Sequence, residues 1–204
     1  MNGQKPKRVK MKYKKTAATR ESVYSAAVSL MAEKGYAGAT IRDICRRASV
    51  SPATFYSYYG SKFDILWDMY RESNVFFRDT VSKEVEGKPF YEQLRIFTSS
   101  YARMNIETGL DLMRVLFNPE NAWFTHPRPM QEVLREIFSE AIEKSLLKSE
   151  KCTSELVDYM FVLLRGVCFD WCIHEGAFDL EAAMLEHIDT MLFGLLGEKA
   201  CAAD

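Results

Sequence analysis

The sequence predicts an all-α protein with two helical domains. Apolar residues recur at helical spacing along most of its 204 residues, and no segment alternates well enough to form a strand. A dense set of helix-capping residues lies between positions 40 and 62. Charge is also divided: residues 1–62 hold 13 Lys and Arg against 3 Asp and Glu (net +10), and the remainder holds 14 against 25 (net −11). A basic head on an acidic body favours a head that meets a polyanion.

We expect three parts: a basic disordered arm at residues 1–16, a small helical domain at 17–77 and a larger helical domain at 78–204. The arm holds seven basic residues among its first fifteen and no acidic one. It is either a solubilising tail or a segment that reaches along or into the minor groove of DNA.

The small domain begins with a helix from about Thr19 to Lys34, whose apolar face faces the next two helices. Thr40 caps the second helix, with Asp43 three residues on, because a threonine oxygen accepts an orphan backbone N–H. Ile41, Ile44 and Ala48 then fall on one face. Ser51 caps a third helix whose first residue is Pro52. Phe55 points inward, and the outer surface is small and polar: Pro52, Ala53, Thr54, Tyr56, Ser57 and Tyr58. A short helix with an apolar back and a hydroxyl-rich front fits a major groove, so residues 40–59 are typical of a helix-turn-helix.

These residues resemble the DNA-binding domain of the TetR (tetracycline-repressor type) family of transcriptional regulators. The matching segments are Glu33-Lys34-Gly35-Tyr36, the run from Ala39 to Ile44, Ala48-Ser49-Val50-Ser51, the run from Thr54 to Tyr59, Ser61-Lys62 and Ile65-Leu66. Ser49 and Ala53 stand where the family commonly has glycine, and Phe63 stands where it usually has glutamate. The resemblance covers about a third of the chain, and beyond it only the general all-helical plan is shared.

The resemblance implies roles for the matching positions. The start of the second helix, with Thr40 and Arg42, faces phosphate, because a helix N-terminus presents free N–H groups. Tyr56 and Lys62 match the family's phosphate-binding tyrosine and lysine. Base reading falls to Ser51, Pro52, Ala53, Thr54 and Tyr58. None of these makes the bidentate contact of Arg, Asn or Gln, so specificity draws on thymine methyls, water, DNA shape and basic residues outside the helix, such as Arg42 or the arm. Arg46 and Arg47 are left open between solvent and DNA.

The rest of the chain reads as helices. A long one runs from Ser61 to about Val85 and ends at Gly87-Lys88-Pro89. The others are expected at about 90–108, 110–117, 130–147, 153–175 and 180–196, with a break at Asn118-Pro119-Glu120-Asn121.

The last two helices are too apolar for one small domain to cover. Membrane insertion is disfavoured, because the apolar run is short and contains charges. A two-fold homodimer would bury the surplus, and the resemblance implies the same arrangement on a pseudo-palindromic operator. The residues predicted for this interface are Leu164, Trp171, Ile188, Leu192 and Leu195.

The larger domain is also rich in aromatic residues and methionine. These residues form either an ordinary helical core or, as the resemblance implies, a pocket for a small hydrophobic or aromatic effector. The residues predicted for the pocket are Trp67, Phe97, Tyr101, Met104, Met113, Phe117, Trp123 and Met160.

Other functions find little support. Cys168, Cys172 and His174 could form half a metal site, but buried free cysteines are commoner, and we expect no metal and no cofactor. No nucleophile motif or polar catalytic cluster points to an enzyme. The absence of a secretory signal and the odd cysteine count predict a cytoplasmic protein. The prediction is a dimeric transcriptional repressor released from DNA by its effector. The alternative is a DNA-bound structural or protein-recruiting factor without an effector.

If the arm contacts DNA, deletion of residues 2–15 should flatten the dependence of DNA affinity on salt, because fewer counterions are released on binding. The measurement is DNA affinity over a series of salt concentrations. An unchanged slope would rule the contact out.

Overall fold

The computed structural model describes residues 7–118 and 128–196, without the side chains of residues 7–16, 195 and 196. Every regular element among these residues is a helix, which confirms the predicted fold class. The chain divides into two compact units, Met1–Met69 and Tyr70–Asp204. The predicted domain boundary, at residue 77, lies eight residues beyond this division. No helix among the described residues is long and apolar enough to cross a membrane.

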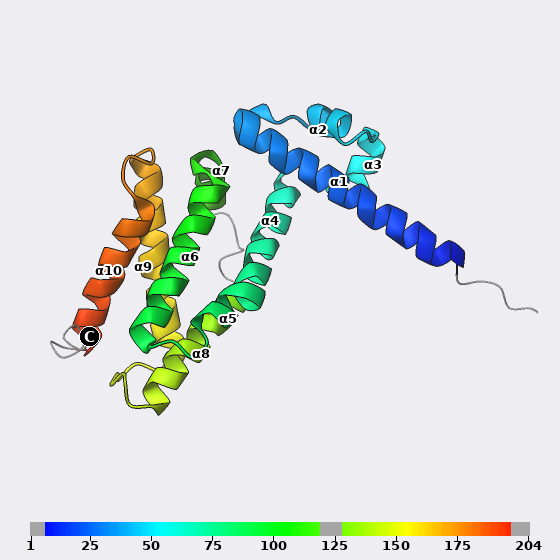
Figure 1. Cartoon of the computed structure of the whole chain (residues 1–204). Coiled ribbons are helices and arrows are strands. Elements are labelled where there is room, and N and C mark those ends of the chain that lie inside the picture. Colours follow the sequence, from blue (N-terminus) through cyan, green and yellow to red (C-terminus); the bar gives the residue numbers. More distant parts are fainter. Residues whose placement is uncertain (1–6, 119–127, 197–204) are drawn as a thin grey trace, which may run out of the picture. The chain divides into compact units, whose positions relative to one another are not determined.

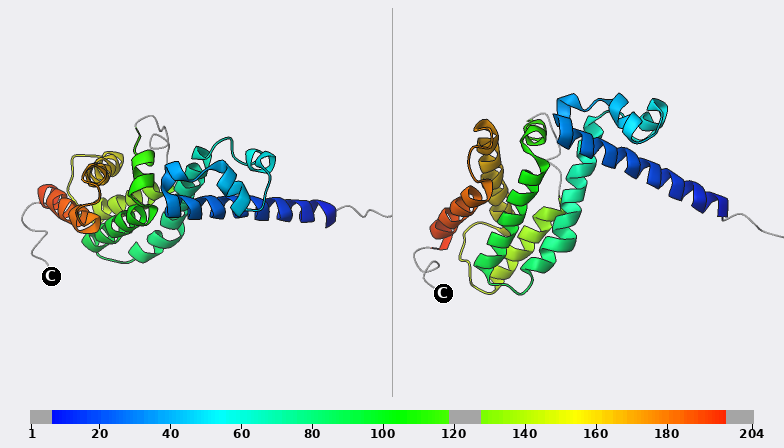
Figure 2. Two further views of the ribbon diagram at one scale, coloured as in Figure 1. Left: turned by 90° about the horizontal axis from the view of Figure 1, so that it is seen from above. Right: turned by 45° about the horizontal axis from the view of Figure 1, so that its top comes forward.

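The first unit holds α1 (Lys7–Gly38), α2 (Ile41–Arg47), α3 (Pro52–Tyr56) and the start of α4 (Phe63–Phe76). In both views of Figure 2, α1 continues well beyond the short helices α2 and α3. The expected start at Thr19 was therefore too late, and the part of the predicted disordered arm from Lys7 onward is helical. The run from Lys7 to Lys34 contains neither glycine nor proline, so nothing in it interrupts a helix.

The core of this unit is the one that the sequence predicted. Val23, Ala27, Leu30 and Met31 of α1 are buried, as are residues of the three following helices: Ile44, Phe55, Ile65 and Leu66. Phe55 lies at the centre of the α3 contacts, with its ring 5.8 Å from the Tyr59 ring.

A buried polar contact joins α1, α4 and the segment that follows α3. Asp68 of α4 accepts hydrogen bonds on Oδ2 from the guanidinium of Arg20 on α1 and from the hydroxyl of Tyr59, the latter at 2.8 Å. The Arg20 guanidinium also lies 5.3 Å from the Tyr59 ring centre. Burial and the bond to Asp68 raise the pKa of Tyr59. The hydroxyl therefore stays protonated and keeps donating, which holds the end of the α3 segment against α1 and α4.

The second unit contains the rest of α4, the π-helical turn η1 (Phe77–Val81), α5 (Ser82–Val85), α6 (Phe90–Thr108) and α7 (Leu110–Leu116). It also contains α8 (Pro129–Glu143), α9 (Thr153–Ile173) and α10 (Leu180–Leu196). In Figure 1, α6 lies between the α4–α5 segment and the α9–α10 pair, and it packs against α7, α8, α9 and α10. The helix expected to reach residue 147 ends at Glu143, and Ser145 has a left-handed backbone with φ of 58°.

Four aromatic rings form the centre of this second unit. Phe77 lies 4.9 Å from Phe97, and Phe161 lies 6.2 Å from Phe97 and 6.0 Å from Tyr101, all between ring centres. Edge and tilted contacts at these distances are favourable for aromatic pairs. The cluster joins η1, α6 and α9 into one core.

Ser49, in the turn between α2 and α3, has φ of 55°. A side chain is strained in this left-handed conformation, whereas glycine adopts it freely. We therefore expect Ser49→Gly to raise the free energy of unfolding by about 0.5–1 kcal/mol, the left-handed cost less the extra entropy that glycine loses.

Chemical denaturation of the two proteins measures this difference. The control is Ser57→Gly, because Ser57 has φ of −74° and donates a hydrogen bond to the Thr54 carbonyl (2.7 Å). This change should lower stability. A destabilised Ser49→Gly protein would contradict the strain argument.

Candidate nucleic-acid interface

Two side-chain caps set the ends of α2 and α3. The Asp43 backbone N–H donates to Thr40 Oγ1 (3.1 Å), and the Thr54 N–H donates to Ser51 Oγ (3.1 Å), as the sequence predicted. The Thr40 hydroxyl in turn donates to Asp43 Oδ2 (2.9 Å), and this bond is the main cause that lowers the pKa of Asp43. Each cap satisfies one N–H and leaves other N–H groups at the helix start for an anion.

The outer face of α3 is exposed as expected. Ser51, Pro52, Ala53 and Ser57 are exposed, and Tyr56 is 55% exposed. Thr54 and Tyr58, predicted to read bases, are half-buried. Phe55 and Tyr59 face inward, so the short helix has one apolar side and one side of hydroxyls and small groups. Such a helix, held at its back and open at its front, can enter a major groove.

Lys62, the predicted phosphate ligand, has partners inside the unit. Its ammonium donates to the backbone carbonyl of Tyr36 and lies 4.0 Å from the centre of the Tyr36 ring. These contacts hold Lys62 beside the last turn of α1. The sequence places Lys62 at a helix start but gives no sign of this long-range partner.

The arginines of α2 divide into two groups. Arg47 forms two parallel bonds with Glu33 on α1, at 2.6 and 2.7 Å, and also donates to Ser29 Oγ. This bidentate pair fixes α2 to α1, so we assign Arg47 a structural role. Arg42 is exposed, and Arg46 lies 3.2 Å from Asp43 at the surface. Together with the α3 face, Thr40, Arg42 and Lys62 form what we call the groove face. This geometry defines a protein of the helix-turn-helix class.

Comparison with known proteins identifies the family. The model for bacterial regulatory proteins of the tetR family matches residues 23–68. The HTH-type transcriptional regulator HbdR of Aromatoleum sp. (strain CIB) is 35% identical over 68 residues, which make up 33% of this chain and 30% of HbdR. An uncharacterized HTH-type regulator of Bacillus subtilis, YxbF, is 39% identical over 61 residues, 29% of this chain and 16% of YxbF. Residues 23–68 therefore form a helix-turn-helix head of the tetR type.

Other similarities extend beyond the head, at lower identity. The fatty acid metabolism regulator protein of Bacillus subtilis is 21% identical over 181 residues, 85% of this chain and 93% of that protein. Thermus thermophilus FadR, solved with lauroyl-CoA, has a TM-score of 0.68 and 22% identity and covers 91% of this chain and 99% of its own. Bacillus subtilis FadR with stearoyl-CoA has a TM-score of 0.67 and 19% identity and covers 87% and 97%. At these identities the solved structures show a shared fold. The first curated relatives match only over the head, so this chain spans 16% of YxbF and 30% of HbdR.

The residues predicted for an effector pocket are only partly brought together. Phe97 and Tyr101 join the aromatic cluster, whose other members, Phe77 and Phe161, the sequence did not single out. Met113 and Met160 are also buried in the second unit, whereas Met104 and Phe117 are half-buried there. Trp67 belongs to the first unit, and Trp123 lies outside the described residues. The pocket stays a prediction.

The residues predicted for the dimer interface are inward-facing wherever their side chains are described. Leu164, Trp171, Ile188 and Leu192 are all buried within the single chain, and the side chain of Leu195 lies outside the described part. A residue buried in its own core has no surface for a partner. The sequence could not separate the two faces, because a helix that is apolar all round gives no periodic signal for the face that it exposes.

We expect Lys62→Ala to weaken binding to all DNA sequences alike and to reduce the salt slope by about one, because it removes one phosphate contact. Thr54→Ala should instead change the sequence preference with little effect on the slope. Fluorescence anisotropy with specific and unrelated duplexes at several salt concentrations measures both.

The control for this pair is Lys88→Ala, which removes an ammonium paired with Glu92 (2.9 Å) in the second unit. Circular dichroism of each variant shows whether the helices remain folded. Weaker DNA binding by a folded variant then reflects a lost DNA contact and not unfolding caused by loss of the Tyr36 contact. An unchanged salt slope in a folded Lys62→Ala protein would show that Lys62 was wrongly matched to the phosphate-binding lysine of the family.

Proposed function

We propose that this protein is a cytoplasmic, dimeric transcriptional repressor that binds a pseudo-palindromic operator and is released by a small hydrophobic effector. The observation that supports DNA binding most directly is the groove face, with its two capped helix starts and exposed Tyr56. The net charge of +10 over residues 1–62 supports the same partner, because phosphate contacts supply most of the affinity for DNA.

Acyl thioesters are the effector class that the comparisons favour. Two solved neighbours of this fold were determined in complex with lauroyl-CoA and stearoyl-CoA, and both are under 25% identical to this chain. The buried aromatic and methionine side chains of the second unit suit a long apolar chain. Effector binding would favour one of two dimer geometries and thereby lower the affinity for DNA.

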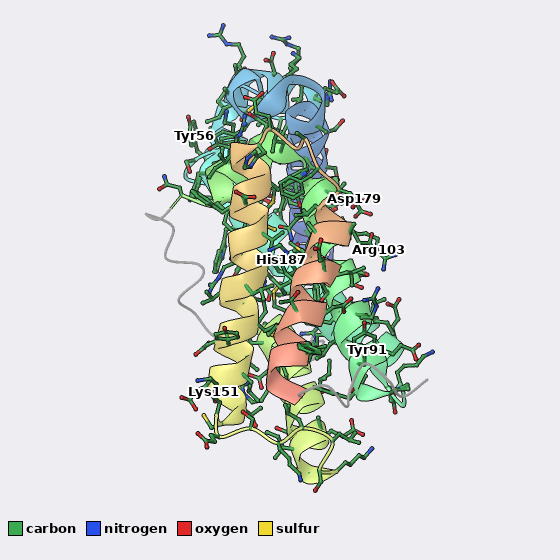
Figure 3. All side chains as sticks on the ribbon, turned by 90° about the vertical axis from the view of Figure 1, so that its left-hand side faces the viewer. Tyr56, Tyr91, Arg103, Lys151, Asp179 and His187 are labelled. Carbon is green, nitrogen blue, oxygen red and sulfur yellow. The ribbon has the colours of Figure 1, made fainter. Side chains whose placement is uncertain are left out.

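The dimer would form on an exposed apolar stripe of α9 and α10. The large exposed residues there are Tyr159, Val162, Phe169 and Ile173 on α9 and Phe193 on α10. A groove of about 640 Å³ lies between the two helices, and its lining includes Val162, Gly166, Ala183, Glu186 and His187. Figure 3 faces these two helices, with His187 labelled on α10, Lys151 near the start of α9 and Asp179 just before α10. A second copy would bury this stripe, and small residues permit close approach of its helices.

Selection of genomic fragments with purified protein, followed by a salt titration on the best fragment, tests the function. We expect a pseudo-palindromic site, a steep salt slope and release on addition of lauroyl-CoA. Tight specific binding that no acyl thioester weakens would support the DNA-binding regulator and would reject acyl thioesters as its effectors. Weak binding without sequence preference would favour the structural or protein-recruiting alternative.

We expect Val162→Asp to convert the dimer to a monomer at micromolar concentration, because Val162 is 63% exposed at the centre of the stripe and a buried carboxylate would be costly there. Sedimentation velocity measures the change. Ile106→Asp, at a 43% exposed aliphatic residue on α6, is the matched control and should remain dimeric. If both variants stay dimeric, another surface carries the interface.

A further inference from the structure

Asp64 is an exposed acidic residue close to the lysine that is predicted to bind phosphate. It lies in the first turn of α4, two residues after Lys62. A DNA phosphate repels a carboxylate, so an acidic residue at this place calls for a physical reason. The structure supplies one, because both oxygens of this carboxylate are bonded to the segment that leads into the helix.

The short segment between Tyr59 and α4 is held by this one side chain. Asp64 Oδ2 accepts from the backbone N–H of Gly60 (2.7 Å) and of Ser61 (3.1 Å). Asp64 Oδ1 accepts from the Ser61 hydroxyl (3.0 Å). Backbone N–H groups at the start of a helix have no partner within it, and bonds to a charged acceptor are stronger than neutral ones. The carboxylate therefore fixes the two residues that precede Lys62.

Gly60 allows the carboxylate to come this close. A Cβ atom added to Gly60 would lie 3.1 Å from Asp64 Oδ2, which is tighter than ordinary van der Waals contact. A side chain at this position would therefore push the carboxylate away from the Gly60 N–H. The glycine and the aspartate, four residues apart, fit one another, and the path of the segment depends on the bond between them.

Lys62 extends from this fixed segment toward the end of α1. Its ammonium donates to the Tyr36 carbonyl and lies 4.0 Å from the centre of the Tyr36 ring. Asp64 acts on the same tyrosine, because burial raises the pKa of Tyr36 and the charge of Asp64 raises it further. A lysine side chain is flexible, so the place of its charge depends on where its backbone is held and on what its stem and ammonium contact. Asp64 fixes the backbone, and Tyr36 provides the contact.

We propose that Asp64 is the positioning residue for Lys62, which holds the Gly60–Ser61 backbone so that the lysine ammonium meets a DNA phosphate. The inference rests on the proposed DNA-binding function and on the phosphate contact predicted for Lys62. Asp64 also repels phosphate, but across solvent and at physiological salt this repulsion changes the DNA affinity by less than about threefold. Loss of a charge-assisted contact weakens binding by about tenfold, so the positioning effect is the larger one.

A double-mutant cycle of Asp64 and Lys62 tests the proposal, by fluorescence anisotropy with the best genomic fragment at several salt concentrations. Asp64→Ala removes all three bonds. We expect it to weaken binding by about tenfold and to lower the salt slope by about one. In a Lys62→Ala protein the same change should not weaken binding further, because the contact is already lost. Asp64→Asn keeps one acceptor oxygen without the charge and should restore most of the affinity.

Gly60→Ala is a second variant, and it leaves every charge in place. Its Cβ atom crowds the carboxylate, so the affinity and the salt slope should both fall, as in Asp64→Ala. It carries the same test should Asp64→Ala fail to fold, as judged by circular dichroism and thermal melting. The matched control is Glu21→Ala, at an exposed acidic residue on α1. This change removes one negative charge from the same unit and should alter the DNA affinity by less than about threefold.

Three results would overturn the proposal. A folded Asp64→Ala protein that binds DNA at least as tightly as the unchanged protein would show that the carboxylate only repels phosphate. An equal loss of affinity in the Lys62→Ala background would show that Asp64 acts on the whole unit and not through Lys62. An unchanged affinity and salt slope in Lys62→Ala would remove the contact that is to be positioned. Failure of the unchanged protein to bind any specific site would instead contradict the proposed function.

Discussion

The groove face of this protein depends on one buried carboxylate. Asp68 receives the Arg20 guanidinium and the Tyr59 hydroxyl, and so joins α1, the end of the α3 segment and α4. The helix α3 has only five residues, too few to be stable alone. Its position is therefore set by tertiary contacts: Phe55 in the core, Asp68 at the back and the Arg47–Glu33 pair across α1 and α2. Its exposed side is left free to vary in sequence, which is the part a DNA site would read.

The range over which interactions act explains why the first unit could be predicted from the sequence in detail and the second unit only in outline. A cap such as Thr40 or Ser51 bonds to a backbone N–H only three residues away, so the local sequence is enough to predict it. The faces of α9 were not predictable in this way, because both Leu164, which is buried, and Val162, which is exposed, belong to one continuous apolar run. Which face is buried depends on the helices that pack against α9, chiefly α8 and α10, and the α9 sequence does not encode where they lie.

Long-range pairs account for what the site prediction missed. Lys62 with Tyr36, Arg47 with Glu33 and Arg128 with Phe161 join residues 14 to 33 positions apart. Each involves a cation whose type alone suggests a surface position. Cationic residues were assigned to DNA or to solvent from sequence, whereas the fold uses several of them to hold its own elements in place.

The π-helical turn at Phe77–Val81 changes which residues share one side of the continuous helix formed by α4, η1 and α5. Tyr70, Asn74, Phe77, Val81 and Val85 succeed one another at steps of three or four residues, and the last three are buried apolar residues. In a regular α-helix, Val85 would be rotated about 60° from Tyr70 around the axis. A π-helical turn holds more residues than an α-helical turn, so each residue rotates by a smaller angle around the axis. This smaller rotation offsets the 60° displacement of Val85. A polar stretch and an apolar stretch thereby share one continuous side of this helix, and loss of a single residue within the turn would put them out of step.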